Sequence, residues 1–197
     1  MFTGLITHLG HFREYRQGRT EIVIEVPEEV ARKTEPGQSL AVDGVCLTLL
    51  KKEHLRLVFN LSKETLERST LGSLRSGQLL NLEFPVTLET GLGGHLVTGH
   101  VDATGQVAEV KLKSPGKRMK VKHPPELRKF VVEKGSIAIN GVSLTVAQAG
   151  PDYFEVELIP ATLSTTNLDH LRPGQKVNLE CDIIGKYVYN FISKTVY

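Results

Sequence analysis

Short runs of alternating apolar and polar residues recur along the chain. Residues 21–26, 55–59 and 154–158 each follow this period of two, which is typical of a strand with one buried face. Turn residues interrupt such runs about every eight to twelve positions, a spacing found in sandwiches and barrels. The pattern therefore predicts an all-β class, with a small antiparallel barrel as the most plausible unit.

The pattern occurs twice. Residues 43–48 read Asp-Gly-Val-Cys-Leu-Thr, and 97 positions later residues 140–145 read Asn-Gly-Val-Ser-Leu-Thr. Asn81–Glu83 matches Asn178–Glu180 at the same offset, and Thr3-Gly4 resembles Thr98-Gly99. A unit of this size can hold its own core, and two copies are too few for a solenoid. We therefore expect two similar β domains in tandem.

Short helices interrupt each unit. We expect one after Pro27 or Pro124, and another over residues 64–69 or 161–166. Residues 185–197 have no copy in the first half, and their apolar positions fall at helical spacing: Val188, Phe191, Ile192, Thr195 and Val196. Such a helix could pack on its own barrel. Because it lies outside both repeats, we favour packing against the same helix of other subunits.

Composition narrows the function classes. The chain has 24 basic and 22 acidic residues, a net charge of +2 and 6% aromatic residues, so a nucleic-acid-binding barrel or a membrane-surface protein is disfavoured. Two cysteines cannot form a disulfide framework, and their spacing does not indicate a zinc site. No signal peptide or membrane-spanning run is evident. We expect a cytoplasmic protein.

Candidate chemistry falls on the repeated segment. Residues two apart on a strand share a face, so Cys46 pairs with Thr48 and Ser143 with Thr145. These residues could simply fill a tapered barrel interior, and a free cysteine is often buried. The exchange of cysteine for serine at matched positions instead favours two related ligands in different roles.

His100 adds a second difference between the halves, because Leu5 stands at its place in the first. Histidine can move protons near neutral pH, although a structural histidine is equally consistent with the pattern. We interpret residues 91–95, Gly-Leu-Gly-Gly-His, as the linker and entry turn between the domains, since the third glycine of a dinucleotide-binding loop is missing. His95 and His100 would point to opposite strand faces, so no metal site is expected.

Together, Met1–Gly4, Gly44–Thr48, Gly93–Val101 and Gly141–Thr145 make the chain similar to the riboflavin synthases of the alpha-chain type over nearly its full length. The resemblance implies two six-stranded Greek-key barrels, at residues 1–94 and 95–184, followed by a trimerisation helix at 185–197. It implies a homotrimer whose active sites form between the N-terminal barrel of one subunit and the C-terminal barrel of its neighbour. The implied reaction is dismutation of two 6,7-dimethyl-8-ribityllumazine molecules to riboflavin and a ribitylamino-pyrimidinedione, without metal or organic cofactor. Association with lumazine synthase stays open.

The resemblance also implies site residues. Catalytic roles would fall to Cys46, His100, Ser143 and Thr145. In the first barrel the substrate would meet Gly4, Leu5, Ile6, Leu47, Thr48, Asn60, Leu61, Ser62, Lys63, Glu64 and Thr65. In the second it would meet Gly99, His100, Val101, Ser143, Leu144, Ile159, Pro160, Ala161, Thr162, Leu163 and Ser164, with Lys134 reaching across the subunit boundary and with Phe2 and Asp182 nearby. The alternative is a non-catalytic lumazine- or flavin-binding antenna protein of the same fold, disfavoured because the four candidate catalytic residues are all present.

Overall fold

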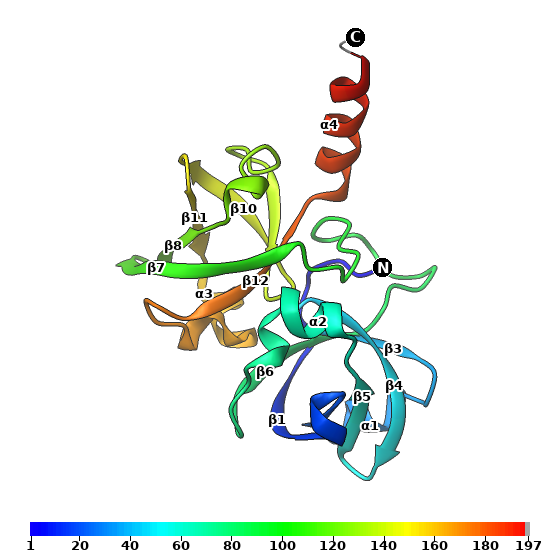
Figure 1. Cartoon of the computed structure of the whole chain (residues 1–197). Coiled ribbons are helices and arrows are strands. Elements are labelled where there is room, and N and C mark those ends of the chain that lie inside the picture. The colour runs from blue at the N-terminus through cyan, green and yellow to red at the C-terminus, as the bar shows by residue number, and fades with distance from the viewer. Residues whose placement is uncertain (196–197) are drawn as a thin grey trace.

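The chain folds into two β-barrels and a projecting C-terminal helix (Figure 1). The computed structural model describes residues 1–195. Helix α4 spans Ile183–Thr195, so Val196, which we expected on its apolar face, and Tyr197 lie outside the described residues. Within the described residues, no helix combines the length and apolar character needed to cross a membrane.

The first barrel contains strands β1 to β6, all paired antiparallel. They are β1 (His8–Arg16), β2 (Glu21–Glu25), β3 (Ser39–Val42), β4 (Val45–Glu53), β5 (Arg56–Asn60) and β6 (Leu79–Glu83). The order around the closed barrel is β1-β2-β5-β4-β3-β6. The sequence order is therefore rearranged in space, as in a Greek key.

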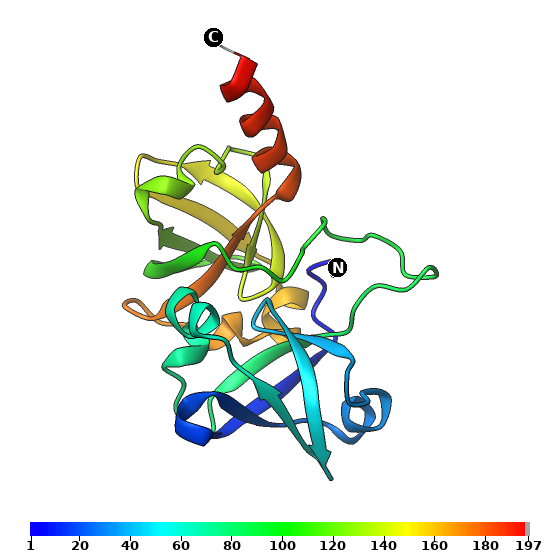
Figure 2. The same ribbon diagram turned by 45° about the vertical axis from the view of Figure 1, so that its right-hand side comes forward.

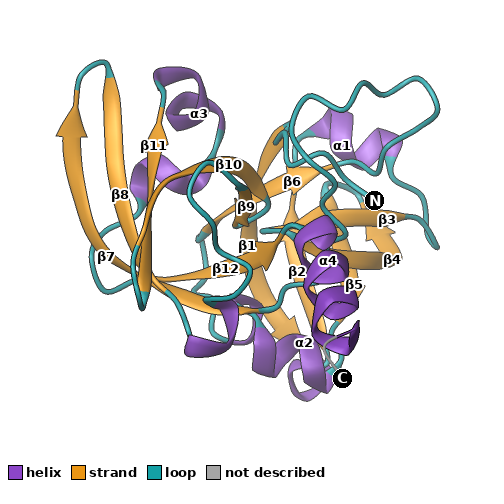
Figure 3. Ribbon diagram, turned by 90° about the horizontal axis from the view of Figure 1, so that it is seen from above, coloured by secondary structure: helices purple, strands orange, loops and turns teal. Residues whose placement is uncertain are grey.

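The second barrel repeats this topology. Its strands are β7 (Ala103–Lys113), β8 (Gly116–Lys122), β9 (Ser136–Ile139), β10 (Val142–Ala149), β11 (Tyr153–Leu158) and β12 (Lys176–Cys181). The closed order β10-β11-β8-β7-β12-β9 matches the first barrel strand for strand. Seen from above, the barrels lie side by side (Figure 3). The predicted duplication of an all-β unit is confirmed.

The repeated dipeptides form the turns that open β4 and β10. Asp43 and Gly44 have φ angles of 46° and 77°, and Asn140 and Gly141 have 46° and 78°. Positive φ at both central residues is the geometry of a two-residue hairpin turn that Asp-Gly and Asn-Gly favour. The two turns touch, since a Cβ added to Gly44 would lie 2.6 Å from the nitrogen of Gly141. The turns thus join the barrels.

Alternation along β4 and β10 decides which residues face outward. Val45, Leu47 and Leu49 enter the first core, and Val142, Leu144 and Val146 enter the second. Cys46 and Ser143 are half-buried on the outer wall, and Thr48 and Thr145 are exposed. The interpretation that these four polar residues fill barrel interiors is therefore wrong, because the larger apolar neighbours occupy those positions.

Short helices cover the barrel ends close to the predicted positions. They are α1 (Glu28–Lys33), α2 (Lys63–Arg68) and α3 (Pro160–Thr165), with 3-10 turns η1 (Gln17–Arg19), η2 (Thr70–Gly72), η3 (Pro125–Leu127) and η4 (Asn167–His170). The helix expected after Pro124 is only the 3-10 turn η3. The two repeats therefore place their short helices at matching positions, but the type of helix after Pro27 differs from that after Pro124.

The extended segment that precedes the first strand of each barrel packs against the other barrel. Phe2 and Val97 form an antiparallel bridge, with N···O distances of 2.7 and 3.1 Å. Beyond the bridge, Ile6 packs on the core of the second barrel and Val101 on the core of the first. In Figure 2 the connection between the barrels (green) loops out to the right and returns past the N-terminus. The segments that precede β1 and β7 therefore cross over.

Candidate active site

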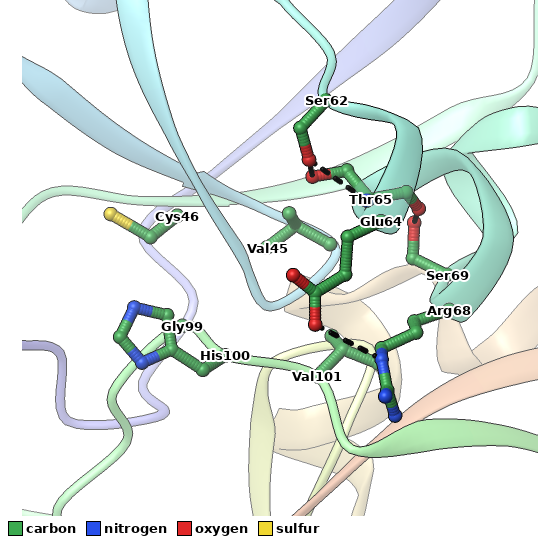
Figure 4. Close-up of a pocket in the computed structure, with 10 residues that line it drawn as sticks. All are labelled: Val45, Cys46, Ser62, Glu64, Thr65, Arg68, Ser69, Gly99, His100 and Val101. Atoms are coloured by element: carbon green, nitrogen blue, oxygen red, sulfur yellow. Dashed lines mark hydrogen bonds and ion pairs between the residues drawn. The ribbon is translucent and has the colours of Figure 1, made fainter.

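The outer wall of the first barrel carries a pocket of about 240 Å³ between β4 and helix α2, the first-barrel pocket. Cys46 and His100 stand on one side of it, and Glu64 and Arg68 stand on the other (Figure 4). The remaining lining residues are Val45, Ser62, Thr65, Ser69, Gly99 and Val101. A thiol and an imidazole thus face groups suited to hydrogen bonding.

The crossing segment brings His100 to Cys46. The amide of Cys46 donates to the carbonyl of Gly99 at 2.8 Å. Gly99 has a φ of +83°, and a Cβ there would lie 2.5 Å from the Cβ of Cys46, so only glycine fits. We expected His100 beside Ser143, and this grouping is wrong because residues 99–101 cross to the first barrel.

The polar side of this pocket is built by α2. The Ser62 hydroxyl accepts a hydrogen bond from the Thr65 amide at 3.0 Å and caps the helix. One turn along, Arg68 lies 3.1 Å from the carboxylate of Glu64. Arg68 also donates to the carbonyl of Asp102 at 3.4 Å. These donors and acceptors are solvent-facing, so a polyol could replace water on them at little cost.

The second barrel carries an equivalent, wider pocket of about 370 Å³, the second-barrel pocket, lined by Lys134, Ser143, Leu144, Thr145, Ala147, Glu157, Ile159 and Thr162. The Ser143 amide donates to the carbonyl of Gly4 at 2.8 Å. A Cβ on Gly4 would lie 2.5 Å from that of Ser143. Gly4, Leu5 and Ile6 therefore accompany the second barrel, not the first as expected, because residues 1–6 also cross over.

His95 is a candidate residue that sequence reasoning missed. Its Nδ1 lies 2.7 Å from the Ser143 hydroxyl, and only 7% of the residue is exposed. Its Nε2 is buried and has no partner among the described residues. Burial lowers the pKa of His95, and the negative charge of Asp182 offsets this only in part. A neutral imidazole is therefore held against the serine.

The repeat could not reveal His95. Val97 matches Phe2, so His95 falls before the first residue of the first repeat. The available signal was the Gly93-Gly94-His95 run, which we interpreted only as a linker. Gly94 is required there, since a Cβ would lie 2.1 Å from the carbonyl oxygen of Thr3.

The other predicted residues surround the pockets without all reaching them. Phe2 is fully buried and packs with Ala41, Val97 and Ala138 behind Cys46. Leu47 and Leu61 point into the first core, and Leu163 packs against the second. Asp182 caps α4, accepting the Ile184 amide at 2.9 Å. Exposed positions around the pockets are Leu5, Thr48, Asn60, Lys63, Pro160, Ala161 and Ser164.

The two pockets differ in more than the exchange of Cys46 for Ser143. Where the first has Ser62 and Glu64, the second has Ile159 and Ala161, and Lys134 has Gly37 as its counterpart in the first repeat. Within the described residues, no group of three or more His, Cys, Asp or Glu side chains is arranged to hold a metal. The arrangement can bind two similar ligands and supply each with a nucleophile near an imidazole.

A family model described as the lumazine binding domain matches the chain twice, at residues 3–85 and 98–182. The two matches coincide with the two barrels. Each also includes the crossing segment that precedes its first strand.

Curated relatives are similar over nearly the whole chain. The riboflavin synthase of Actinobacillus pleuropneumoniae is 38% identical over 195 residues, covering 98% of this chain and 91% of its own. That of Mycobacterium tuberculosis (strain ATCC 25618 / H37Rv) is 40% identical over 194 residues, with coverages of 95% and 96%. That of Bacillus subtilis is 35% identical, with coverages of 98% and 91%.

Solved structures are similar to this chain in fold. LumP in complex with riboflavin superposes with a TM-score of 0.85 at 25% identity, covering 92% of this chain and 99% of that one. LumP in complex with 6,7-dimethyl-8-(1'-D-ribityl) lumazine gives 0.83 at 23% identity, with the same coverages. From the twofold domain match and the full-length relatives, the chain belongs to the riboflavin synthase family of tandem lumazine-binding barrels.

Proposed function

We propose that this protein is a riboflavin synthase, an enzyme that transfers a four-carbon unit between two molecules of 6,7-dimethyl-8-ribityllumazine. One molecule becomes riboflavin and the other the ribitylamino-pyrimidinedione. The observation that carries the proposal is the pair of equivalent pockets with unlike reactive groups, Cys46 with His100 in one and Ser143 with His95 in the other. Two identical substrates in unlike pockets can take unlike roles.

The residues account for the chemistry the reaction needs. The 7-methyl group of the lumazine is acidic, and an imidazole at the pocket wall could remove its proton to give a nucleophilic carbanion. The acceptor lumazine must add a nucleophile, a step suited to the Cys46 thiol or to a water that it orients. Holding the two rings in alignment raises the rate further, because it lowers the entropic cost of bringing them together.

The substrate contacts we propose follow the pockets and their rims. In the first barrel they are Thr48, Asn60 and residues 62–65, with Gly99, His100 and Val101 from the crossing segment. Leu47 and Leu61 point into the core and would support these contacts from behind. In the second they are Leu144, Thr145 and residues 159–164, with Gly4, Leu5 and Ile6 from the other crossing segment, and with Lys134 and Asp182. Phe2 is fully buried behind Cys46 and would support the wall of the first-barrel pocket without touching the substrate. Within this set, Glu64 and Ser62 are the groups that best suit a ribityl hydroxyl.

A homotrimer would bring unlike pockets together. We propose that the chain divides into barrels at 1–94 and 95–184 and a trimerisation helix at 185–197. Helix α4 supports this, because it projects from the second barrel (Figure 1) with Ile184, Val188 and Ile192 along one exposed face. In such a trimer the first-barrel pocket of one subunit can face the second-barrel pocket of its neighbour.

The cellular setting is part of the proposal. The free thiols of Cys46 and Cys181 suit the reducing cytoplasm. Association with a lumazine synthase is the further partner that the resemblance to this family leaves open.

The test is turnover with the lumazine alone. Purified protein is incubated with 6,7-dimethyl-8-ribityllumazine, and riboflavin is followed by its absorbance and fluorescence. Riboflavin should form with one pyrimidinedione for each molecule produced. Tight lumazine binding without riboflavin formation would refute the enzyme and identify an antenna protein.

A further inference from the structure

Two buried glutamates occupy equivalent places at the ends of β6 and β12. Glu83 and Glu180 come from the repeated Asn-Leu-Glu segment, and each residue is only 3% exposed. Neither lines a pocket described above. A buried carboxylate is costly unless hydrogen bonds satisfy it, so its occurrence at both matched positions calls for a reason.

Glu180 holds the segment that leads to His100. Its Oε1 accepts hydrogen bonds from the amide of Thr98 at 2.6 Å and from the hydroxyl of Thr98 at 2.7 Å. Its Oε2 accepts from the amide of Gly99 at 3.1 Å. The Thr98 hydroxyl in turn accepts from the amide of His100 at 3.3 Å. The whole turn before His100 is therefore tied to one side chain of the second barrel.

Glu83 does the same for the other crossing segment. Its Oε1 accepts from the amide of Thr3 at 2.6 Å and from the hydroxyl of Thr3 at 2.8 Å. The amide of Gly4 donates to both oxygens, at 3.2 and 3.1 Å. The Thr3 hydroxyl accepts from the amide of Leu5 at 3.2 Å. The two carboxylates thus accept from the matched threonine and glycine, and they differ only in that Gly4 donates to both oxygens of Glu83.

These contacts act on the opposite barrel. Thr98 and Gly99 are held by a strand of the second barrel, but Gly99 accepts the amide of Cys46 in the first-barrel pocket. Thr3 and Gly4 are held by a strand of the first barrel, but Gly4 accepts the amide of Ser143 in the second-barrel pocket. Each glutamate thus lies in one barrel and fixes the wall of the pocket on the other.

Only a carboxylate satisfies this geometry. Both oxygens must accept, and all three donors are N–H or O–H groups. In glutamine one of the two oxygens is replaced by an NH₂ group, which cannot accept a hydrogen bond from the N–H or O–H group that it would face. Burial raises the pKa of both glutamates, and the hydrogen bonds from the threonine and glycine donors oppose this shift because they favour the charged form.

We propose that Glu180 is a positioning residue for Cys46 and His100, and that Glu83 is a positioning residue for Ser143, each acting from the opposite barrel through its crossing segment. The chemical role of these pockets rests on the proposed function. The positioning itself does not, and it can be measured without turnover.

Alkylation of single thiols in the full-length chain reports on each pocket separately. Cys46 reports on the first-barrel pocket. Ser143→Cys in a Cys46→Ser background reports on the second. Cys181 is buried, and burial raises its pKa to about 12, so its contribution is small and is measured in Cys46→Ser alone.

Glu180→Gln should speed alkylation of Cys46 by iodoacetamide about tenfold, because loss of the hydrogen bonds lets residues 98–101 open. In the Cys46→Ser, Ser143→Cys background, the same substitution should change the alkylation rate of the introduced thiol by less than about twofold. Glu83→Gln should give the reverse pattern.

Several results would overturn the proposal. If each glutamine variant changed only the alkylation rate of the thiol in its own barrel, a local loss of packing would explain the effect. Equal acceleration of both thiols would indicate general destabilisation, and no acceleration would show that the hydrogen bonds do not hold the segments. Should either glutamine variant fail to fold, Thr98→Val and Thr3→Val each remove one hydroxyl, which donates to the glutamate and accepts from the amide of His100 or Leu5, and they must show the same crossed pattern.

The outcome is separable from that of the proposed function. Wild-type turnover decides whether the protein is a riboflavin synthase, and the alkylation pattern decides whether the glutamates position the pockets. In an active wild type, Glu180→Gln should lower kcat more than it weakens riboflavin binding.

Discussion

The Nδ1 atom of His95 lies 2.7 Å from the hydroxyl oxygen of Ser143. The two residues are 48 positions apart, and no repeat or motif connects them. The hydroxyl lines the second-barrel pocket, whereas the imidazole is buried behind it. Because burial lowers the pKa of His95, the ring is neutral near pH 7 and can accept the proton of Ser143.

His95→Gln should reduce kcat about 10- to 100-fold while changing riboflavin affinity little, because glutamine can contact Ser143 but cannot take up its proton. Steady-state turnover and fluorescence titration measure the two quantities. His123→Gln is the matched control. His123 is also buried, and its Nε2 has no partner in the part of the chain that the structure describes, but its Nδ1 contacts the carbonyl of Pro124 and it lines neither pocket. If both variants lost activity equally, burial alone would explain the effect.

Cys46→Ser and His100→Ala should each slow turnover far more than they weaken ligand binding. The structure adds that the two residues share one pocket, so their effects should not be additive. The double variant should be slower than the worse single variant by less than about tenfold. If the fold-loss of kcat in the double variant equalled the product of the two single losses, the two residues would not act in the same step.

Stability should fall as the pH rises through neutrality, because of Asp43. Burial raises the pKa of its carboxyl from 3.8 to about 7, although its Oδ1 accepts hydrogen bonds from Asn81 and Asn167. A folded-state pKa above the unfolded value means that the folded protein retains the proton. The stabilisation is full below about pH 4 and is lost as the pH rises through about 7.

Asp43→Asn should therefore unfold at a higher temperature than wild type at pH 8, and the difference should shrink at pH 5. The difference between the two pKa values limits the pH-dependent contribution of Asp43 to the free energy of unfolding to about 4 kcal/mol. Asn140 occupies the matched position and its Oδ1 accepts the Asn178 amide at 2.8 Å, which shows that an amide fits. The reciprocal variant Asn140→Asp should lose stability at pH 8. A pH-independent effect of either variant would refute a buried titrating carboxyl.

Charge on the apolar face of α4 should break the proposed trimer. Val188 and Ile192 are 50% and 62% exposed, and a glutamate at either position would be buried unpaired in a helix-to-helix interface. Val188→Glu and Ile192→Glu should sediment as monomers and lose most turnover. Asn190→Glu, on another face of the same helix, is the control and should sediment as wild type. A wild type that is itself monomeric would rule out the trimer.

Much of the fold was determined by local pattern. The period of two identified strands at residues 21–26, 55–59 and 154–158, and the Asp-Gly and Asn-Gly dipeptides located the hairpin turns before β4 and β10. These features depend on residues within a few positions of one another, so they can be read along the chain. The offset of 97 then gave two copies of one domain.

The composition of each pocket was decided only by tertiary structure. The sequence placed Cys46 and Ser143 at matched positions, but it assigned His100 and Leu5 to the wrong barrels and missed His95. Those assignments depend on the bridge between Phe2 and Val97, which pairs residues of different domains and makes the extended segments cross. Hydrophobic periodicity describes the burial of neighbours, whereas this pairing is fixed by hydrogen bonds and close glycine contacts between distant residues. The sequence by itself therefore determined two like barrels with cysteine and serine at matched positions, and the crossing decided which histidine lies beside each.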